Sequence, residues 1–156
     1  MNDSTAGDWE RFVRALARCL AELPSRATLV IAASGNRYAQ FVQFDIRLSA
    51  ELAGNDFLLE PISPANAQRL RELGWTAPDA ARDVENWSRT LLWPISQRTL
   101  VRLAEGAAIG LHDAMGVESP ADLRASGWTE NPGSLDLSVL GVADRREPPD
   151  RSHAHG

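Results

Sequence analysis

The sequence is poor in three features that often reveal a function. All 16 basic residues are arginine, so there is no lysine amine for a Schiff base. Cys19 is the single cysteine, which excludes an intramolecular disulfide. The longest wholly apolar runs span only a few residues, such as 29–33, far short of the roughly 20 that cross a bilayer. A disulfide scaffold, a Schiff-base enzyme and a membrane-spanning helix are therefore not expected.

Positive net charge is also missing. The formal charge is −5 and the isoelectric point is near 5.2, whereas proteins that bind duplex nucleic acid usually present a basic face to the phosphates. An acidic surface also disfavours anionic membranes. The first ten residues, MNDSTAGDWE, lack the basic and apolar regions of a signal peptide, so we expect a cytoplasmic protein without nucleic-acid or membrane partners.

Catalytic motifs are absent as well, including the serine hydrolase, zinc protease, Walker A and dinucleotide-binding signatures. His112 falls near the end of a predicted helix, where a partial positive charge satisfies carbonyls. Cys19 lies near an apolar helix stripe and is expected to be a small core residue. His153 and His155 alone make a weak metal site. We predict no catalytic residues, no metal, no cofactor and no enzymatic activity.

Apolar spacing predicts an α+β pattern, starting with an amphipathic helix over residues 9–23 that Asp8 caps and Pro24 ends. Residues 28–33 are apolar on both faces and predict a central strand. Residues 37–44 predict a second strand in which neither face is purely core. Residues 46–52 alternate cleanly, with Ile46, Leu48, Ala50 and Leu52 predicted to point inward.

The second half of the chain contains clear helix boundaries. Ser63 and Pro64 predict a helix start, and Gly74 predicts its end, with Trp75 packing back on Leu70. Residues 87–93 predict a strand.

A long helix is expected to run from Ser96 to Gly116. The pair Ser119-Pro120 predicts a further short helix that Gly127 ends. Beyond it, Leu135, Leu137 and Val139 alternate as a short strand or docking motif would.

These segments predict one domain over residues 1–142, with a C-terminal extension from about residue 128. The segment 143–156 is polar and rich in proline, so we expect a disordered tail. The expected architecture is an antiparallel β-sheet packed with an N-terminal helix and a long C-terminal helix.

Four short motifs suggest a family. They are NRYAQF (36–41), SAELAGNDFL (49–58), LGW (73–75) and NW (86–87). In this order and spacing, over roughly residues 9–127, the chain resembles the actinobacterial YbjN-like domains, also called TY-Chap because they look like type III secretion chaperones. The resemblance implies a chaperone-like α+β fold, and a non-catalytic module that holds or escorts a client protein, possibly in a specialised secretion pathway.

Aromatic, arginine and amide side chains in the predicted strands provide the candidate binding surface. Tryptophan, tyrosine and arginine often anchor protein interfaces, and amides bond an extended backbone. The candidate partner-binding residues are Arg37, Tyr38, Gln40, Phe41, Gln43, Trp87, Arg89 and Trp93.

Two alternatives stay open. The first is a homodimer or other structural or regulatory subunit, assembled through the helix face that carries Gly106 and Gly110. The second is a small-molecule or enzymatic site, which would require Arg37, Gln40 and Arg89 to converge in a pocket.

Overall fold

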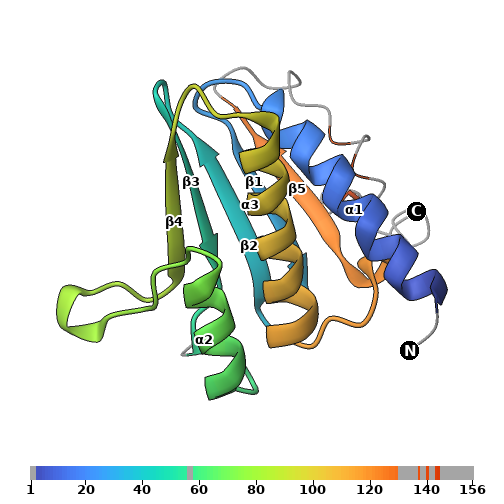
Figure 1. The fold of residues 1–156 in the computed structure, drawn as a ribbon, viewed down its shortest axis with the longest axis vertical. Coiled ribbons are helices and arrows are strands. Elements are labelled where there is room, and N and C mark those ends of the chain that lie inside the picture. The colour runs from blue at the N-terminus through green and yellow to red at the C-terminus, as the bar shows by residue number, and fades with distance from the viewer. Residues whose placement is uncertain (1–2, 56–57, 130–136, 138–139, 141–142, 145–156) are drawn as a thin grey trace, which may run out of the picture.

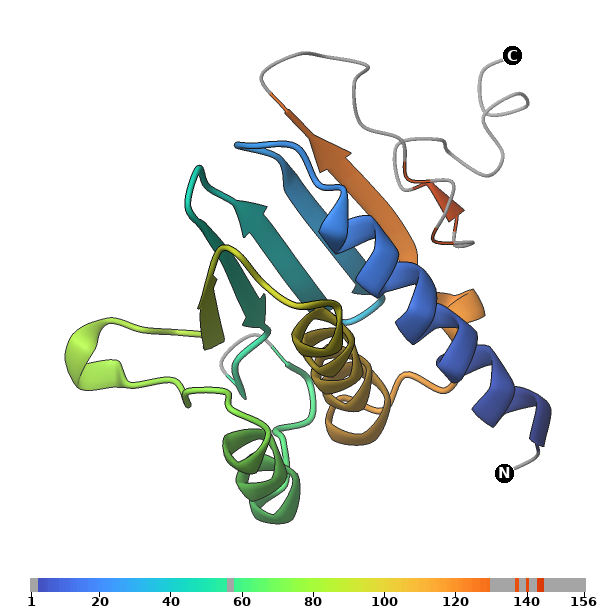
Figure 2. The same cartoon turned by 45° about the horizontal axis from the view of Figure 1, so that its top comes forward.

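A six-stranded sheet and three α-helices make up the fold of the computed structural model, which describes residues 3–55, 58–129, 137, 140 and 143–144. The helices α1 (Asp3–Ala21), α2 (Pro64–Glu72) and α3 (Gln97–Ile109) lie on one side of the sheet. Figures 1 and 2 show α3 across the middle of the sheet, with α1 on one flank and α2 on the other. The predicted α+β class is confirmed.

The strand order in the described part of the chain is β4-β3-β2-β1-β5-β6. The strands are β1 (Thr28–Ala33), β2 (Arg37–Gln43), β3 (Arg47–Leu52), β4 (Trp87–Leu92), β5 (Arg124–Trp128) and β6 (Ala143–Asp144). The first five pair antiparallel, and the two-residue β6 pairs parallel with β5. The edge strands are therefore β4 and β6.

The core lies between the sheet and the helices. Leu29, Ile31, Phe41 and Leu48 point from the sheet toward the helices and are fully buried. The helices contribute Trp9, Phe12, Leu16, Leu20, Leu100, Leu103 and Leu111. We call the opposite side of the sheet the open face, since no described helix covers it. Strand β1 is thus buried on one face and half-buried on the other. Its predicted central position is confirmed, since it pairs with β2 on one side and β5 on the other.

Most helix boundaries follow the predicted capping residues. The Ser63 side chain accepts from Asn66 N at 3.2 Å, and Ser96 does the same for Thr99 N at 3.1 Å. Gly74 has a φ of +102°, and Trp75 N donates to Leu70 O at 3.0 Å, as a Schellman motif requires. Both helix starts and the end at Gly74 are confirmed.

Three boundaries differ from the sequence prediction. Helix α1 begins at Asp3, so Asp8 lies inside it and is not its cap. The Ser119-Pro120 start leads only to one 3₁₀ turn, η4 (Pro120–Asp122), and the next residues form β5 because they pair with β1. Ile46 is 66% exposed, since it precedes β3.

The region after β5 lies mostly outside the described residues, including Leu135, Val139 and the tail from residue 145. Leu137 is buried. Ala143–Asp144 were placed in the disordered tail, but they form β6 because their backbone pairs with Arg124 and Ala125.

Two glycines of the last helical segment allow close packing within the domain. A Cβ on Gly106 would lie 2.7 Å from the Trp75 Nε1, and a Cβ on Gly110 would lie 2.6 Å from Leu52 Cδ1. Gly110 begins a π-helical turn, η3 (Gly110–Ala114), that continues α3. Both glycines therefore face the protein's own core, so residues of the same chain occupy the helix face that the homodimer alternative assigned to assembly.

Candidate functional site

The eight predicted binding residues fall on both faces of the sheet. By strand alternation, Tyr38 and Gln40 belong to the open face, with Val30 and Glu51 beside Gln40. The Asn86 side chain donates to the Tyr38 hydroxyl at 2.8 Å. Burial raises the pKa of Tyr38, the bond from Asn86 lowers it, and the charges of Glu51 and Glu85 raise it. The predicted set is therefore not a single surface.

Two of the predicted aromatic residues belong to the core. Phe41 is 0% exposed and Trp87 is 3% exposed, so neither can anchor a partner on the surface. Their inclusion was wrong because both strand positions point toward the helices. Gln43 and Trp93 are half-buried and bond each other, the indole Nε1 donating to Gln43 Oε1 at 2.7 Å.

Arg37, Gln40 and Arg89 do not converge. Arg37 Nε donates to Ser34 O at 2.7 Å, next to the β1–β2 turn, and its Nη1 donates to Met115 O at 3.4 Å. Gln40 is on the open face, whereas Arg89 is on β4 and faces the helices. The pocket required by the small-molecule alternative is not formed.

The outer edge of β4 presents unpaired backbone groups. Ser88 exchanges two hydrogen bonds with Thr76, at 2.8 and 3.0 Å, so its N–H and C=O point away from β3. Alternate residues of a strand share this direction, which places the backbone groups of Thr90 and Leu92 on the same outer side. No described residue pairs with them. We call residues 90–92 the free edge of β4, which is the outermost strand in Figure 1.

Exposed apolar side chains surround the free edge. Leu92 is 67% exposed, and Ile46 lies beside the end of β4, where Trp93 N donates to Ile46 O at 2.9 Å. Arg47 pairs with Leu92 across the two strands, and its guanidinium lies 4.2 Å from the centre of the Phe44 ring. The free edge of β4 therefore offers backbone hydrogen-bonding groups and exposed apolar side chains in the same place.

An arginine pair flanks the same strand on the helix side. Arg89 is half-buried, and its Nη1 donates to Leu73 O at 3.1 Å, at the end of α2. Burial lowers the pKa of Arg89, and the charge of nearby Arg102 lowers it further. Within the described residues, neither guanidinium makes an ion pair with a carboxylate.

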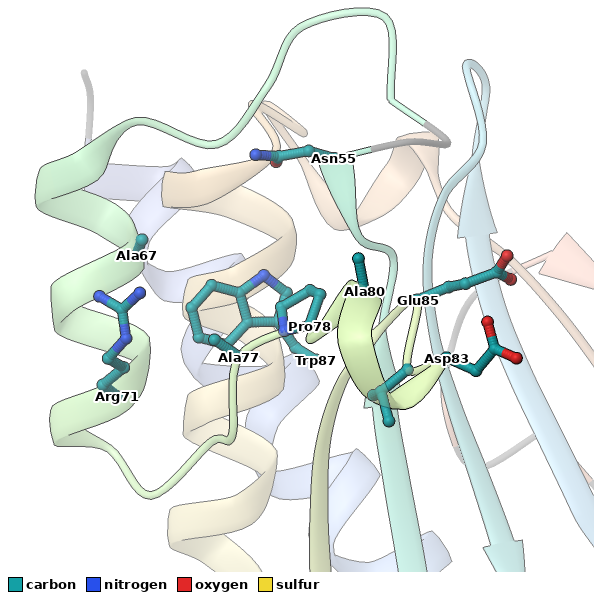
Figure 3. A pocket seen from close by; sticks show the side chains of 10 residues that line it. Asn55, Ala67, Arg71, Ala77, Pro78, Ala80, Asp83, Glu85 and Trp87 are labelled. Atoms are coloured by element: carbon teal, nitrogen blue, oxygen red, sulfur yellow. The ribbon is translucent and has the colours of Figure 1, made fainter.

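Among the hollows away from this edge, two border the helices. One, of about 520 Å³, lies between α2 and the loop before β4. Figure 3 shows Ala67 and Arg71 on the α2 side of this hollow and Pro78 beside the Trp87 indole. The Asp83 carboxylate points away from the hollow. The other, of about 840 Å³, is a largely apolar groove over the outer face of α3. It is lined by Trp9, Glu10, Val13, Arg14, Leu73, Val101, Glu105, Ala108, Ile109, His112 and Asp113.

Neither a metal-binding cluster nor a membrane-spanning helix is found among the described residues. Those residues contain no group of three or more His, Cys, Asp or Glu side chains placed to hold a metal ion. None of the described helices is both long and apolar enough to cross a membrane.

The predicted set missed Thr90, Ile46 and Leu92. Residues 90–92 carry no charge, glycine or proline, which is the only local signal of an unprotected strand edge. Whether β4 is an edge strand depends on the order of strands in the sheet, which the sequence pattern does not predict.

Comparison with known proteins supplies a family. A family model described as "T3SS (YopN, CesT) and YbjN peptide-binding chaperone 3" matches residues 2–129. Neither the comparison with curated proteins nor the comparison with solved structures found a match. The matched region contains α1, the first five strands and the free edge of β4, and the order of elements agrees with the resemblance read from the motifs. The chain belongs to the TY-Chap3 family of peptide-binding chaperones.

Proposed function

We propose that this protein is a non-catalytic, chaperone-like module that binds an extended segment of a client protein as an added strand on the free edge of β4. The observation that carries the proposal is the outward-facing backbone of Thr90 and Leu92, which no described residue pairs with, beside exposed apolar side chains. Backbone hydrogen bonds provide affinity in such strand addition, and pockets for alternate side chains provide specificity. Membership of a peptide-binding chaperone family supports the same function.

The apolar residues next to the edge supply the second part of the interaction. An added strand places a side chain beside Leu92 on the open face, and a segment that extends past the strand end reaches Ile46 and Phe44. Covering these side chains removes apolar surface from water, which favours association. The client segment is therefore extended and partly apolar.

The cellular setting belongs to the same proposal. The family description names type III secretion chaperones, so the client is proposed to be a protein handed to a specialised secretion pathway from the cytoplasm. Self-assembly through Gly106 and Gly110 is not part of the proposal, because both glycines pack against Trp75 and Leu52 of the same chain.

Two substitutions at Thr90 test strand addition. Proline at Thr90 removes an outward N–H while the bonds between β3 and β4 remain, since proline is tolerated where an edge strand faces solvent. The probe is a random library of short unstructured peptides from which wild-type protein selects binders. We expect Thr90→Pro to lose these peptides, whereas Thr90→Val, which keeps the N–H, retains them.

Two results count against the proposal. Equal binding by folded Thr90→Pro and Thr90→Val would remove the free edge from the site and favour one of the two hollows. A library from which wild-type protein selects nothing would remove peptide binding itself.

A further inference from the structure

We propose that the free edge of β4 selects client segments that carry an acidic side chain, and that Arg89 and Arg102 together bind this carboxylate. The inference rests on the proposed function and names the chemistry of its client. It concerns the helix side of β4, whereas the apolar contacts with Leu92 lie on the open face.

Arg89 is held in position but has unused hydrogen-bond donors. Its Nη1 bonds Leu73 O at the end of α2, and the Gly74 backbone lies close to the guanidinium, where an added Cβ would be 3.1 Å from Cζ. A guanidinium has five N–H donors, and among the described residues Arg89 has this one hydrogen-bond partner. The capping bond therefore orients the side chain and leaves the rest of its fork for a ligand.

Arginine is concentrated around β4 in a protein that is acidic as a whole. Residues 86–104, which include β4 and the first half of α3, contain Arg89, Arg98 and Arg102 but no aspartate or glutamate, and Glu85 and Glu105 border this stretch. Arg89 is half-buried and Arg102 is exposed, neither makes an ion pair with a described carboxylate, and their like charges repel each other. A carboxylate from outside the chain relieves this repulsion, and arginine binds it with two parallel hydrogen bonds.

Strand addition brings such a carboxylate to the correct side. Side chains of an added strand alternate between the two faces, so every second one lies on the helix side, next to Arg89 and Leu91 of β4. Directly opposite residues have Cβ atoms about 5 Å apart and diagonal ones about 7 to 8 Å, within reach of a long arginine side chain. Aspartate or glutamate at one of these positions meets the arginine pair.

The alternative is that Arg89 has a purely structural role and only caps α2. That reading leaves Arg102 without a role, because Arg102 is exposed and makes no hydrogen bond or ion pair with the described residues. The test therefore uses Arg102→Gln as its main variant, since this substitution leaves the capping bond in place. Arg89→Gln is the second variant, and thermal unfolding checks that it remains folded.

The experiment selects binders from the random peptide library with wild-type protein, Arg102→Gln and Arg18→Gln. Arg18 is an exposed arginine of α1, so its variant has the same net charge as Arg102→Gln and serves as the control. We expect wild type and Arg18→Gln to enrich peptides with aspartate or glutamate at one fixed position, and Arg102→Gln to lose this enrichment while it still binds peptides.

A single selected peptide then sharpens the result. Replacing its acidic residue by the matching amide should weaken binding to wild type about tenfold, as for other charged pairs. The same replacement should change binding to Arg102→Gln or Arg89→Gln much less. This non-additivity is expected only if the arginine and the acidic residue interact.

The outcomes separate the inference from the proposed function. Peptides that bind through the free edge, and are lost with Thr90→Pro, but show no acidic enrichment would overturn the inference alone. Acidic enrichment that persists in both Arg102→Gln and Arg89→Gln would do the same. Failure of wild-type protein to select any peptide would overturn the proposed function and, with it, this inference.

Discussion

The two edges of the sheet differ in what the chain supplies to them. At one edge, β5 is covered by β6, whose two residues pair with Arg124 and Ala125. At the other, the outer side of β4 is bridged at Ser88 by Thr76, and no described residue pairs with the outer side of residues 90–92. One edge is thus paired with the chain's own backbone, and the other has no partner on its outer side beyond Ser88 in the described part of the chain.

The composition of the free edge strengthens this contrast. Natural sheets protect edge strands with charges, proline or bulges, because a bare edge promotes aggregation. Thr90, Leu91 and Leu92 have none of these devices, and the exposed Leu92 adds apolar surface. An unprotected edge is a liability in an idle protein and an advantage in one that binds extended peptides.

The largest effect is expected on stability, when proline is introduced at Leu91 instead of at its neighbour Thr90. The Leu91 N–H faces β3, so Leu91→Pro removes a ladder bond, leaves a β3 carbonyl without its partner and should lower the free energy of unfolding by about 1 to 3 kcal/mol. The Thr90 N–H faces outward, and Thr90→Pro should change stability by less than about 1 kcal/mol. Chemical denaturation of both variants checks this. Similar losses in the two variants would show that the outer side of β4 is not free.

A smaller effect compares exposed apolar residues near the two edges. Leu92→Ser should weaken binding of a selected peptide about tenfold or more, since burying a leucine contributes about 1.5 to 3 kcal/mol. Trp128, 54% exposed on β5, is the matched position at the other end of the sheet. We expect Trp128→Ser to leave affinity unchanged in the same fluorescence titration. Equal losses would place the peptide across the open face instead.

The smallest effect concerns Tyr38, between the two edges. Its pKa is raised, chiefly by burial, so the folded state holds the phenol proton more tightly than the unfolded state does. The stability gained is present below about pH 10 and is lost as the pH rises through the folded pKa. Because Tyr38 is the single tyrosine, tyrosinate absorbance reports it directly. Folded protein should titrate at higher pH than urea-unfolded protein; coincident curves would refute this.

Local chemistry explains why much of the fold was predictable. Ser63, Ser96 and Gly74 act through hydrogen bonds and dihedral angles within a few residues, so their roles are visible in the sequence. The helix predicted after Ser119-Pro120 was wrong because a contact distant in the sequence decides the structure there. Its capping chemistry does start a turn, but pairing with β1 over Arg124–Trp128 overrides helix continuation, and that contact is distant in the sequence.

The site was less predictable because burial and strand order are properties of the whole fold. Aromatic type alone selected Phe41 and Trp87, which the helices bury. Arg89 was selected for its chemistry, but the effect of the Arg102 charge on its pKa arises from the fold, and sequence reasoning did not associate the two residues. The free edge itself follows from β4 being the last strand in the order β4-β3-β2-β1-β5-β6.

Amide hydrogen exchange at Thr90 and Leu92 tests the central claim most directly. Both N–H groups point outward from β4 without a described partner, so they should exchange quickly in the free protein. Saturation with a peptide selected from the library should slow exchange at Thr90 and Leu92, while Leu91, already paired with β3, changes little. Bound peptide that leaves both outward amides exchanging at their original rates would contradict strand addition at β4.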